Sequence, residues 1–110
     1  MEIKEKQYYK DKLAICLMKF LDNNKLDQSG DDLIIKSLRN LESASGVSYP
    51  IIQKISKGER NPNLTTLISI ADGLEVSVSK FFQAFDEISD KEVKDFQKKK
   101  TRYSKEKKGT

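Results

Sequence analysis

Apolar residues recur every three or four positions along most of this chain, which is the spacing of helices that bury one face. No stretch alternates apolar and polar residues as a strand would, and the chain has no internal repeat. The first apolar stripe predicts a helix over residues 5–22, and six residues form it: Tyr9, Leu13, Cys16, Leu17, Phe20 and Leu21. Ile15 and Met18 fall outside this stripe, and they could pack under the following segment or form a subunit contact. The pattern therefore predicts an all-α protein.

The segment over residues 23–36 predicts a long link rather than a helix. Asn23 and Asn24 indicate the end of the first helix, and Gln-Ser-Gly at residues 28–30 indicates a turn. The apolar run at residues 33–35 must be covered by other residues. Either Asp31 or Asp32 caps an early extension of the next helix, or the run docks in an extended form.

Residues 37–62 predict two short helices joined by a tight turn. Ser37 is a favourable cap for the first helix, in which Leu38, Leu41 and Ser45 share one face. The Gly-Val-Ser sequence at residues 46–48 ends that helix, because glycine tolerates the left-handed backbone of a C-terminal cap. Two helices joined by a three- to four-residue turn containing glycine form a helix-turn-helix unit, whose second helix can lie in a DNA major groove.

The second of these helices predicts one buried and one outward face. Ser48 caps it, Pro50 occupies its first turn and Gly58 ends it. Ile52 and Ile55 define the buried face, and Ile51 and Ser56 flank them. The opposite face carries Pro50, Gln53, Lys54 and Lys57, with Tyr49 at the leading end, and residues 47–58 contain no acidic residue. An ordinary amphipathic helix with a solvated face is the alternative, but the spacing of the cap, glycine, valine and paired isoleucines favours DNA binding.

Four sequences carry a family resemblance: G-V-S, I-Q-K-I, G-E-R-N-P-N-L-T-T-L and G-L-E-V-S-V. With them, residues 13–82 resemble the repressor/Cro-type (XRE-type) helix-turn-helix family. The resemblance implies a five-helix DNA-binding domain that is usually dimeric on its operator. It implies base-reading positions at Tyr49, Pro50 and Lys54, and a less regular contact at Gln53. The whole set expected to contact DNA is Ser37, Ser48, Tyr49, Pro50, Gln53, Lys54, Lys57, Arg60 and Asn61, of which Lys57, Arg60 and Asn61 match phosphate-contacting positions.

Two residues depart from the family pattern. The family usually has a small residue, often alanine, where this chain has Glu42, which puts close helix packing there in doubt. The family usually has a polar residue, often glutamine, where this chain has Leu38, so that a phosphate contact from this side chain is lost.

Two further helices are predicted after the loop. Asn63 caps the first, whose buried stripe is Leu64, Leu67, Ile68, Ala71 and Leu74. Gly73 lies near its end and Ser77 caps the next helix, which closes the core with four residues: Val78, Phe81, Phe82 and Phe85.

The C-terminal segment predicts a short helix followed by a disordered basic tail. Ser89 and Glu92 form a capping box, and Ile88 with Val93 forms a hydrophobic staple. The helix should end near Lys99, because the sequence beyond it has few apolar residues. This tail either contacts DNA phosphates or keeps the protein soluble. The expected organisation is an N-terminal helix and link at residues 1–36, a helix-turn-helix core at 37–85, and a short helix with a flexible tail at 86–110.

Composition narrows the classes of function. The 110 residues include 21 basic and 17 acidic side chains, and most of the excess lies in residues 86–110. With one Cys and no His, the chain has no disulfide framework, zinc constellation or histidine-based catalytic group, so that we expect no enzyme, cofactor or metal. Cys16 is expected to be a small buried hydrophobe. The N-terminus lacks an apolar signal region and no segment approaches a membrane span of about 20 apolar residues, which predicts a cytoplasmic protein.

These features predict sequence-specific binding to double-stranded DNA by a homodimeric transcription regulator, a repressor acting at an operator. The alternative is a protein-interaction module, such as an antitoxin or an inhibitor of another regulator. The low basicity of the motif and the off-stripe residues Ile15 and Met18 favour this alternative, in which the main partner is a protein.

Overall fold

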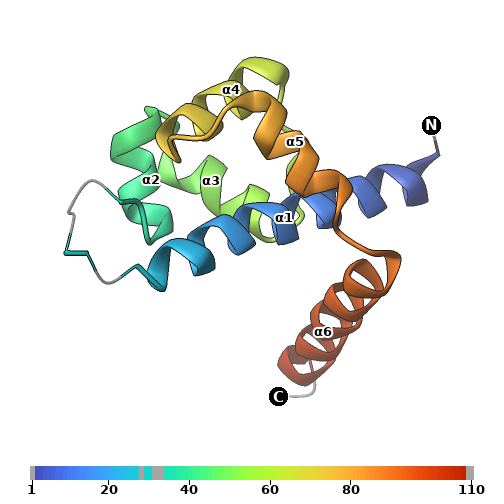
Figure 1. The fold of residues 1–110 in the computed structure, drawn as a ribbon. Helices are drawn as coiled ribbons and strands as arrows, with labels where there is room; N and C mark the ends of the chain where they lie inside the picture. The colour runs from blue at the N-terminus through green and yellow to red at the C-terminus, as the bar shows by residue number, and fades with distance from the viewer. Residues whose placement is uncertain (1, 28, 31–33, 109–110) are drawn as a thin grey trace.

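The computed structural model describes residues 2–27, 29–30 and 34–108, with side chains as far as Thr101 in the last helix. All regular structure in these residues is helical, as the sequence predicted. The described residues form six helices: α1 (Ile3–Lys25), α2 (Leu38–Ser45), α3 (Tyr49–Ser56), α4 (Leu64–Gly73), α5 (Val78–Asp86) and α6 (Asp90–Lys108). Figure 1 shows α6 below α1, on the other side of α1 from the group formed by α2, α3, α4 and α5. None of the described helices is both long and apolar enough to cross a bilayer.

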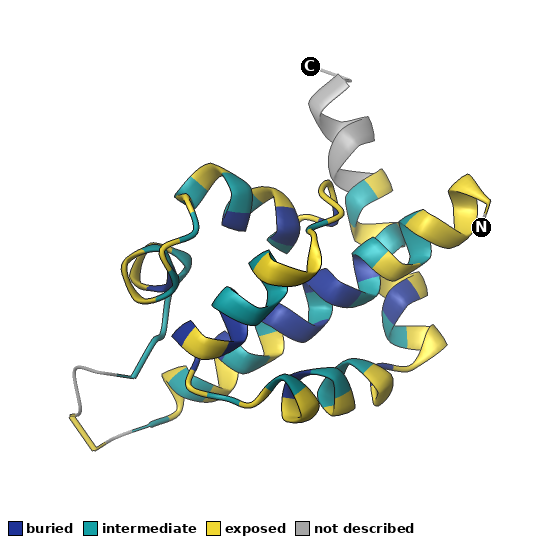
Figure 2. Ribbon diagram, turned by 90° about the horizontal axis from the view of Figure 1, so that it is seen from above, coloured by how far each residue is buried: buried dark blue, intermediate teal, exposed yellow. Residues whose placement is uncertain are grey.

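The long helix α1 is the element on which the others assemble, because it packs against α3, α5 and α6. Most of its buried apolar residues belong to the predicted stripe. Figure 2 shows the buried residues of α1, in dark blue, along the middle of the helix. Tyr9 was wrongly predicted to belong to the core: its side chain is 44% exposed and its ring lies beside that of Phe85. Ile15 and Met18 are half-buried and pack against the core of the same chain, so that they do not require a subunit contact.

Both ends of α1 extend beyond the predicted boundaries. At the C-terminal end, the N–H of Leu26 bonds to the carbonyl oxygens of Asn23 and Asn24, so that the two asparagines lie within the last turn. The link then remains non-helical at Ile34 and Ile35. Ile35 packs against the core and its carbonyl accepts a 2.7 Å hydrogen bond from Asn24 Nδ2, in agreement with extended docking. The caps considered at Asp31 and Asp32, and the position of Leu33, lie outside the described residues.

Three of the inner helices begin at the caps predicted from the sequence. Ser37, Asn63 and Ser77 each accept a hydrogen bond from the backbone N–H three residues later, at 3.1, 2.9 and 3.1 Å. Short polar side chains satisfy there a donor that the helix itself cannot pair. These caps fix where α2, α4 and α5 start.

Packing between α2 and α4 depends on Gly73, which is buried. A Cβ atom at this position would meet Ser45 and Leu41 at 3.0 and 3.1 Å. The predicted α4 stripe was wrong at Leu64, which lies in the first turn and is 62% exposed, and Ile68 is only half-buried. The buried residues of this helix and its C-cap are Ile70, Ala71, Gly73 and Leu74, and Leu67 packs partly against the core.

The start of α6 has the local structure that the sequence predicted. Ser89 N–H donates to Glu92 Oε2 at 2.9 Å and Glu92 N–H donates to Ser89 Oγ at 3.2 Å, which is a capping box. Ile88 and Val93, the staple, are both buried. The helix nevertheless continues to Lys108, so that the predicted end near Lys99 and disorder after it were wrong for residues 100–108. Lysine, glutamine and glutamate are good helix formers, and the sequence of this helix is rich in them.

Side-chain contacts fasten the first turns of α6 to α1. Lys19 Nζ lies 2.5 Å from Glu92 Oε1, and the Tyr8 hydroxyl donates to the carboxylate of Asp90. The hydrogen bond from Lys19, followed by the bond from Ser89 N–H, lowers the pKa of Glu92. The hydrogen bond to Asp90 raises the pKa of Tyr8. These contacts add polar links to the apolar packing of Val93.

Candidate nucleic-acid interface

The turn between α2 and α3 is formed by Gly46, whose φ of 77° is left-handed as predicted. Ser48 is at the cap position of α3, but its side chain makes no capping hydrogen bond. The carboxylate of Glu42 takes that role, because Glu42 Oε2 accepts a 2.6 Å hydrogen bond from Tyr49 N–H. A negative group at a helix N-terminus also interacts favourably with the helix dipole. The residue that departs from the family pattern therefore joins α2 to the start of α3.

The two faces of α3 are arranged as the sequence predicted. Ile52 and Ile55 are buried at 0% and 1% exposure. Pro50 and Lys54 are exposed on the other side, and Tyr49 and Gln53 are half-buried beside them. The outward surface of α3 thus combines an aromatic ring, an amide and an ammonium group in two helical turns.

The C-terminal end of α3 is a Schellman motif centred on Gly58, with a left-handed φ of 73°. Gly58 N–H donates to Ile55 O at 3.1 Å, and Glu59 N–H donates to Lys54 O at 2.9 Å. Lys57, Arg60 and Asn61 are exposed around this turn. The three residues with the expected phosphate-contacting role therefore share one end of α3.

Ser37 lies away from this end, at the start of α2. Its hydroxyl oxygen caps the helix, and the hydroxyl proton can still be donated to another acceptor such as a phosphate. Leu38, beside it, packs partly against the core.

Sequence reasoning missed Arg39 as a member of this surface. Its guanidinium carbon lies 4.0 Å from the centre of the Tyr49 ring, and the Arg39 side chain is exposed. This cation–π contact holds an arginine beside the first residue of α3. The sequence did contain an indication of this role. Arg39 is a basic residue next to Leu38, at the N-terminal end of α2, where the family usually contacts phosphate.

Cys16 lies away from this surface, and its surroundings disfavour reaction of the thiol. Its thiol is buried and Sγ lies 3.7 Å from the carbonyl oxygen of Phe81. Burial raises the pKa of the thiol to about 12, which outweighs the opposite effect of Lys19. Because the thiolate is the reactive form of cysteine, the predicted role of Cys16 as a packing residue agrees with its surroundings.

Comparison with known proteins identifies the part of the chain that carries this surface. Residues 35–81 match the family model described as helix-turn-helix, a span that includes α2, α3, α4 and the first half of α5. Comparisons with curated proteins and with solved structures gave no match. Residues 35–81 therefore belong to the repressor/Cro-type (XRE-type) helix-turn-helix family, whose domains are of the DNA-binding kind found in transcription regulators.

Proposed function

We propose that this protein is a transcription regulator that binds a specific operator in double-stranded DNA and represses by occupying it. The observation that carries this proposal is the outward face of α3. Pro50 and Lys54 are exposed there, opposite the buried Ile52 and Ile55, and residues 47–58 contain no acidic residue that would repel phosphates. A helix of this kind can enter a major groove, where side chains reach base edges.

The positions of the side chains support a division of roles. Tyr49, Pro50 and Lys54, at the start and middle of α3, read bases, and Gln53 makes an additional contact. The residues that flank them, Ser37, Ser48, Lys57, Arg60 and Asn61, contact the sugar-phosphate backbone. Phosphate contacts position the protein and base contacts specify the sequence.

Arg39 extends this set. Its guanidinium is stacked on Tyr49, so that the planar group is held at the leading end of α3. A guanidinium fork can bind either a phosphate or the O6 and N7 atoms of guanine with two hydrogen bonds. Arg39 and Tyr49 therefore act as one contact unit.

A protein-interaction module remains the second candidate function, because the charge of the motif is low. Residues 37–85 contain five basic and four acidic side chains. The other argument for this alternative is weaker than the sequence suggested, since Ile15 and Met18 pack within the chain. The four acidic residues of this segment all lie outside residues 47–58, so that the outward face of α3 carries basic but no acidic side chains, and DNA binding is the better supported function.

Selection of bound sequences from a random duplex pool tests this proposal. The protein should enrich a palindromic consensus, since two copies would each read one half-site. Lys54→Glu should abolish the enrichment, and Lys91→Glu, the same charge change at an exposed residue at the start of α6, should leave it intact. A pool that shows no enrichment with the folded wild-type protein would remove the DNA-binding proposal and favour the protein-partner function.

A further inference from the structure

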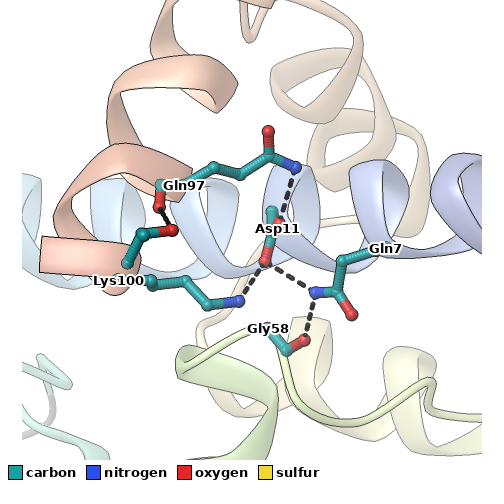
Figure 3. Close-up of polar contacts among 6 residues, drawn as sticks. Gln7, Asp11, Gly58, Gln97 and Lys100 are labelled. Atoms are coloured by element: carbon teal, nitrogen blue, oxygen red, sulfur yellow. Dashed lines mark hydrogen bonds and ion pairs between the residues drawn. The ribbon is translucent and has the colours of Figure 1, made fainter. Parts of the chain in front are cut away.

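A buried carboxylate joins the N-terminal and C-terminal helices. Asp11 on α1 is 0% exposed, although it carries an ionisable group. Figure 3 shows three donors around it: Gln7 Nε2 at 2.9 Å, Gln97 Nε2 at 2.9 Å and Lys100 Nζ at 2.7 Å. Gln97 and Lys100 belong to α6. A buried carboxylate is costly unless it is paired and hydrogen-bonded. Asp11 therefore depends on α6 for its ion-pair partner and for two of these three hydrogen bonds.

The same cluster reaches the C-terminal end of α3. Gln7 Nε2 also donates to the carbonyl oxygen of Gly58 at 2.8 Å. Asp11 leaves no room for a side chain at Gly58: a Cβ atom at Gly58 would lie 2.1 Å from Asp11 Oδ1 and 3.1 Å from Lys100 Nζ. Gly58 thus serves two purposes, since it adopts the left-handed turn that ends α3 and leaves room for the carboxylate. The amide of Gln7 is hydrogen-bonded to the backbone of this turn, and the carboxylate and the ammonium group of Lys100 occupy the space beside Gly58.

This turn is the part of the interface that carries Lys57, Arg60 and Asn61. Its internal hydrogen bonds are those of the Schellman motif, and its only other polar partner in the described residues is Gln7. If the cluster were disrupted, the Gly58 carbonyl would lose that partner, and the Asp11 carboxylate would turn toward water. The turn would then have to be ordered when DNA binds, which lowers affinity.

We propose that α6 is a positioning element for the DNA-binding surface: Lys100 and Gln97 hold Asp11 and Gln7 against Gly58, and this keeps the C-terminal end of α3 in its binding geometry. The inference rests on the proposed DNA-binding function. Lys100 acts here through Asp11 and not by contacting phosphate. A partner that pulled α6 away from α1 would therefore weaken DNA binding without covering α3.

The variant that tests this inference is Lys100→Met, with Lys99→Met as its matched control. Methionine keeps most of the length of lysine and can still pack on the Phe96 ring, which Lys100 now covers. Lys99 is the neighbouring lysine of α6 and is exposed. Affinity for the selected operator should be measured over a salt series, at a temperature where each variant is fully folded. Amide hydrogen exchange should be measured on the same full-length proteins without DNA.

We expect Lys100→Met to raise Kd about fivefold, which corresponds to about the net contribution of one hydrogen bond. The slope of log affinity against log salt should not change, because no phosphate contact is lost. The amides of Gly58 and Glu59 should exchange faster, and those of α4 should not. Lys99→Met should leave exchange at Gly58 and Glu59 at the wild-type rate.

A second variant approaches the cluster from α1. Gln7→Met removes the hydrogen bonds of Gln7 to Gly58 and to Asp11, and leaves the ion pair of Asp11 and Lys100 intact. It should also raise Kd and speed exchange at Glu59, and the double variant should lose less than the sum of the two single losses, since both act through one cluster. Gln7→Met alone tests the inference if Lys100→Met does not fold.

Three results would overturn the inference. One is an unchanged affinity in both Lys100→Met and Gln7→Met. Another is a salt slope that falls by about 0.9 per protomer in Lys100→Met, which would make Lys100 a phosphate contact. The third is unchanged exchange at Gly58 and Glu59 in both variants. If wild-type protein bound no duplex at all, the proposed function would fail, while the exchange measurement would still decide whether α6 orders the turn.

Discussion

Lys54 and Lys57 lie almost one helical turn apart on α3, yet they should act on different parts of the DNA. Both side chains are exposed. Lys54 is within the helix on the outward face, where a lysine can donate to guanine O6 or N7. Lys57 is the C-cap residue, at the end where the groove curves away and phosphates are nearer. The same charge should therefore give specificity at one position and general affinity at the other.

We predict that Lys54→Ala costs about 1–3 kcal/mol of binding free energy on the operator and relaxes the preference at one base pair per half-site. Lys57→Ala should weaken operator and random duplex alike and reduce the salt slope by about one unit per protomer. The measurement is the affinity of each variant for operator, single-base variants and random duplex over a salt series. Unchanged affinity and preference in folded Lys54→Ala would show that this residue does not face the groove.

The helix starts show which parts of the fold the sequence could predict. Ser37, Asn63, Ser77 and the pair of Ser89 and Glu92 cap helices within three residues of themselves, so that local rules were sufficient. The buried pair Ile52 and Ile55 also followed from spacing alone. On the candidate surface, the same spacing predicted that Pro50, Lys54 and Lys57 would be exposed.

The features that the sequence did not predict depend on residues that are far apart in the chain. The donors to Asp11 from α6 are 86 and 89 residues away, and the bond from Gln7 to Gly58 spans 51 residues. The spacing of apolar residues did not indicate that Asp11 is buried, because a buried aspartate cannot be told from an exposed one by its position in the sequence. Glu42 differs, because its partner Tyr49 N–H is only seven residues away. That contact depends on how α2 and α3 are placed relative to one another, which the spacing of apolar residues does not specify.

The end of α4 offers a test of backbone conformation at the scale of one helix. Glu75 adopts a φ of 60°, and Val76 N–H bonds to Ala71 O, so that this residue occupies the position where helices usually place glycine. A side chain in the left-handed region costs roughly 1 kcal/mol. We therefore predict that Glu75→Gly raises the free energy of unfolding by about 0.5–1 kcal/mol, measured by chemical denaturation.

Gly46→Ala is the control for this prediction, because it makes the opposite change and adds a side chain at a residue with left-handed backbone. Gly46 has a φ of 77°, and a Cβ atom there would meet nothing within 4 Å. Any loss of stability in Gly46→Ala would therefore come from the backbone conformation rather than from a clash. A Glu75→Gly protein no more stable than wild type would show that Glu75 makes a compensating contact.

At the scale of the whole molecule, α1 connects the DNA-binding helices to α6. It packs against α3, α5 and α6, and two ion pairs, Lys19 with Glu92 and Asp11 with Lys100, tie it to α6. The first pair is largely exposed and should contribute little to stability. The second is the buried one, and it lies next to the end of α3. The C-terminal helix is thus connected to the interface by geometry and not only by its basic charge.

The size of the interface leads to the last prediction, which concerns the number of protein copies on DNA. A single helix-turn-helix module buries about 600–1,000 Å² on DNA, which rarely gives tight specific binding. We therefore expect two copies to bind two half-sites whose centres are about 34–36 Å apart, one turn of the duplex, so that both copies of α3 enter the groove on one side. Footprinting and the mass of the complex at saturation measure this directly. Duplexes with half a turn inserted between the half-sites should bind far more weakly, and duplexes with a changed sequence but unchanged spacing in the centre should bind nearly as well. A saturated complex with one protein copy on a single unsymmetrical site would contradict the dimer.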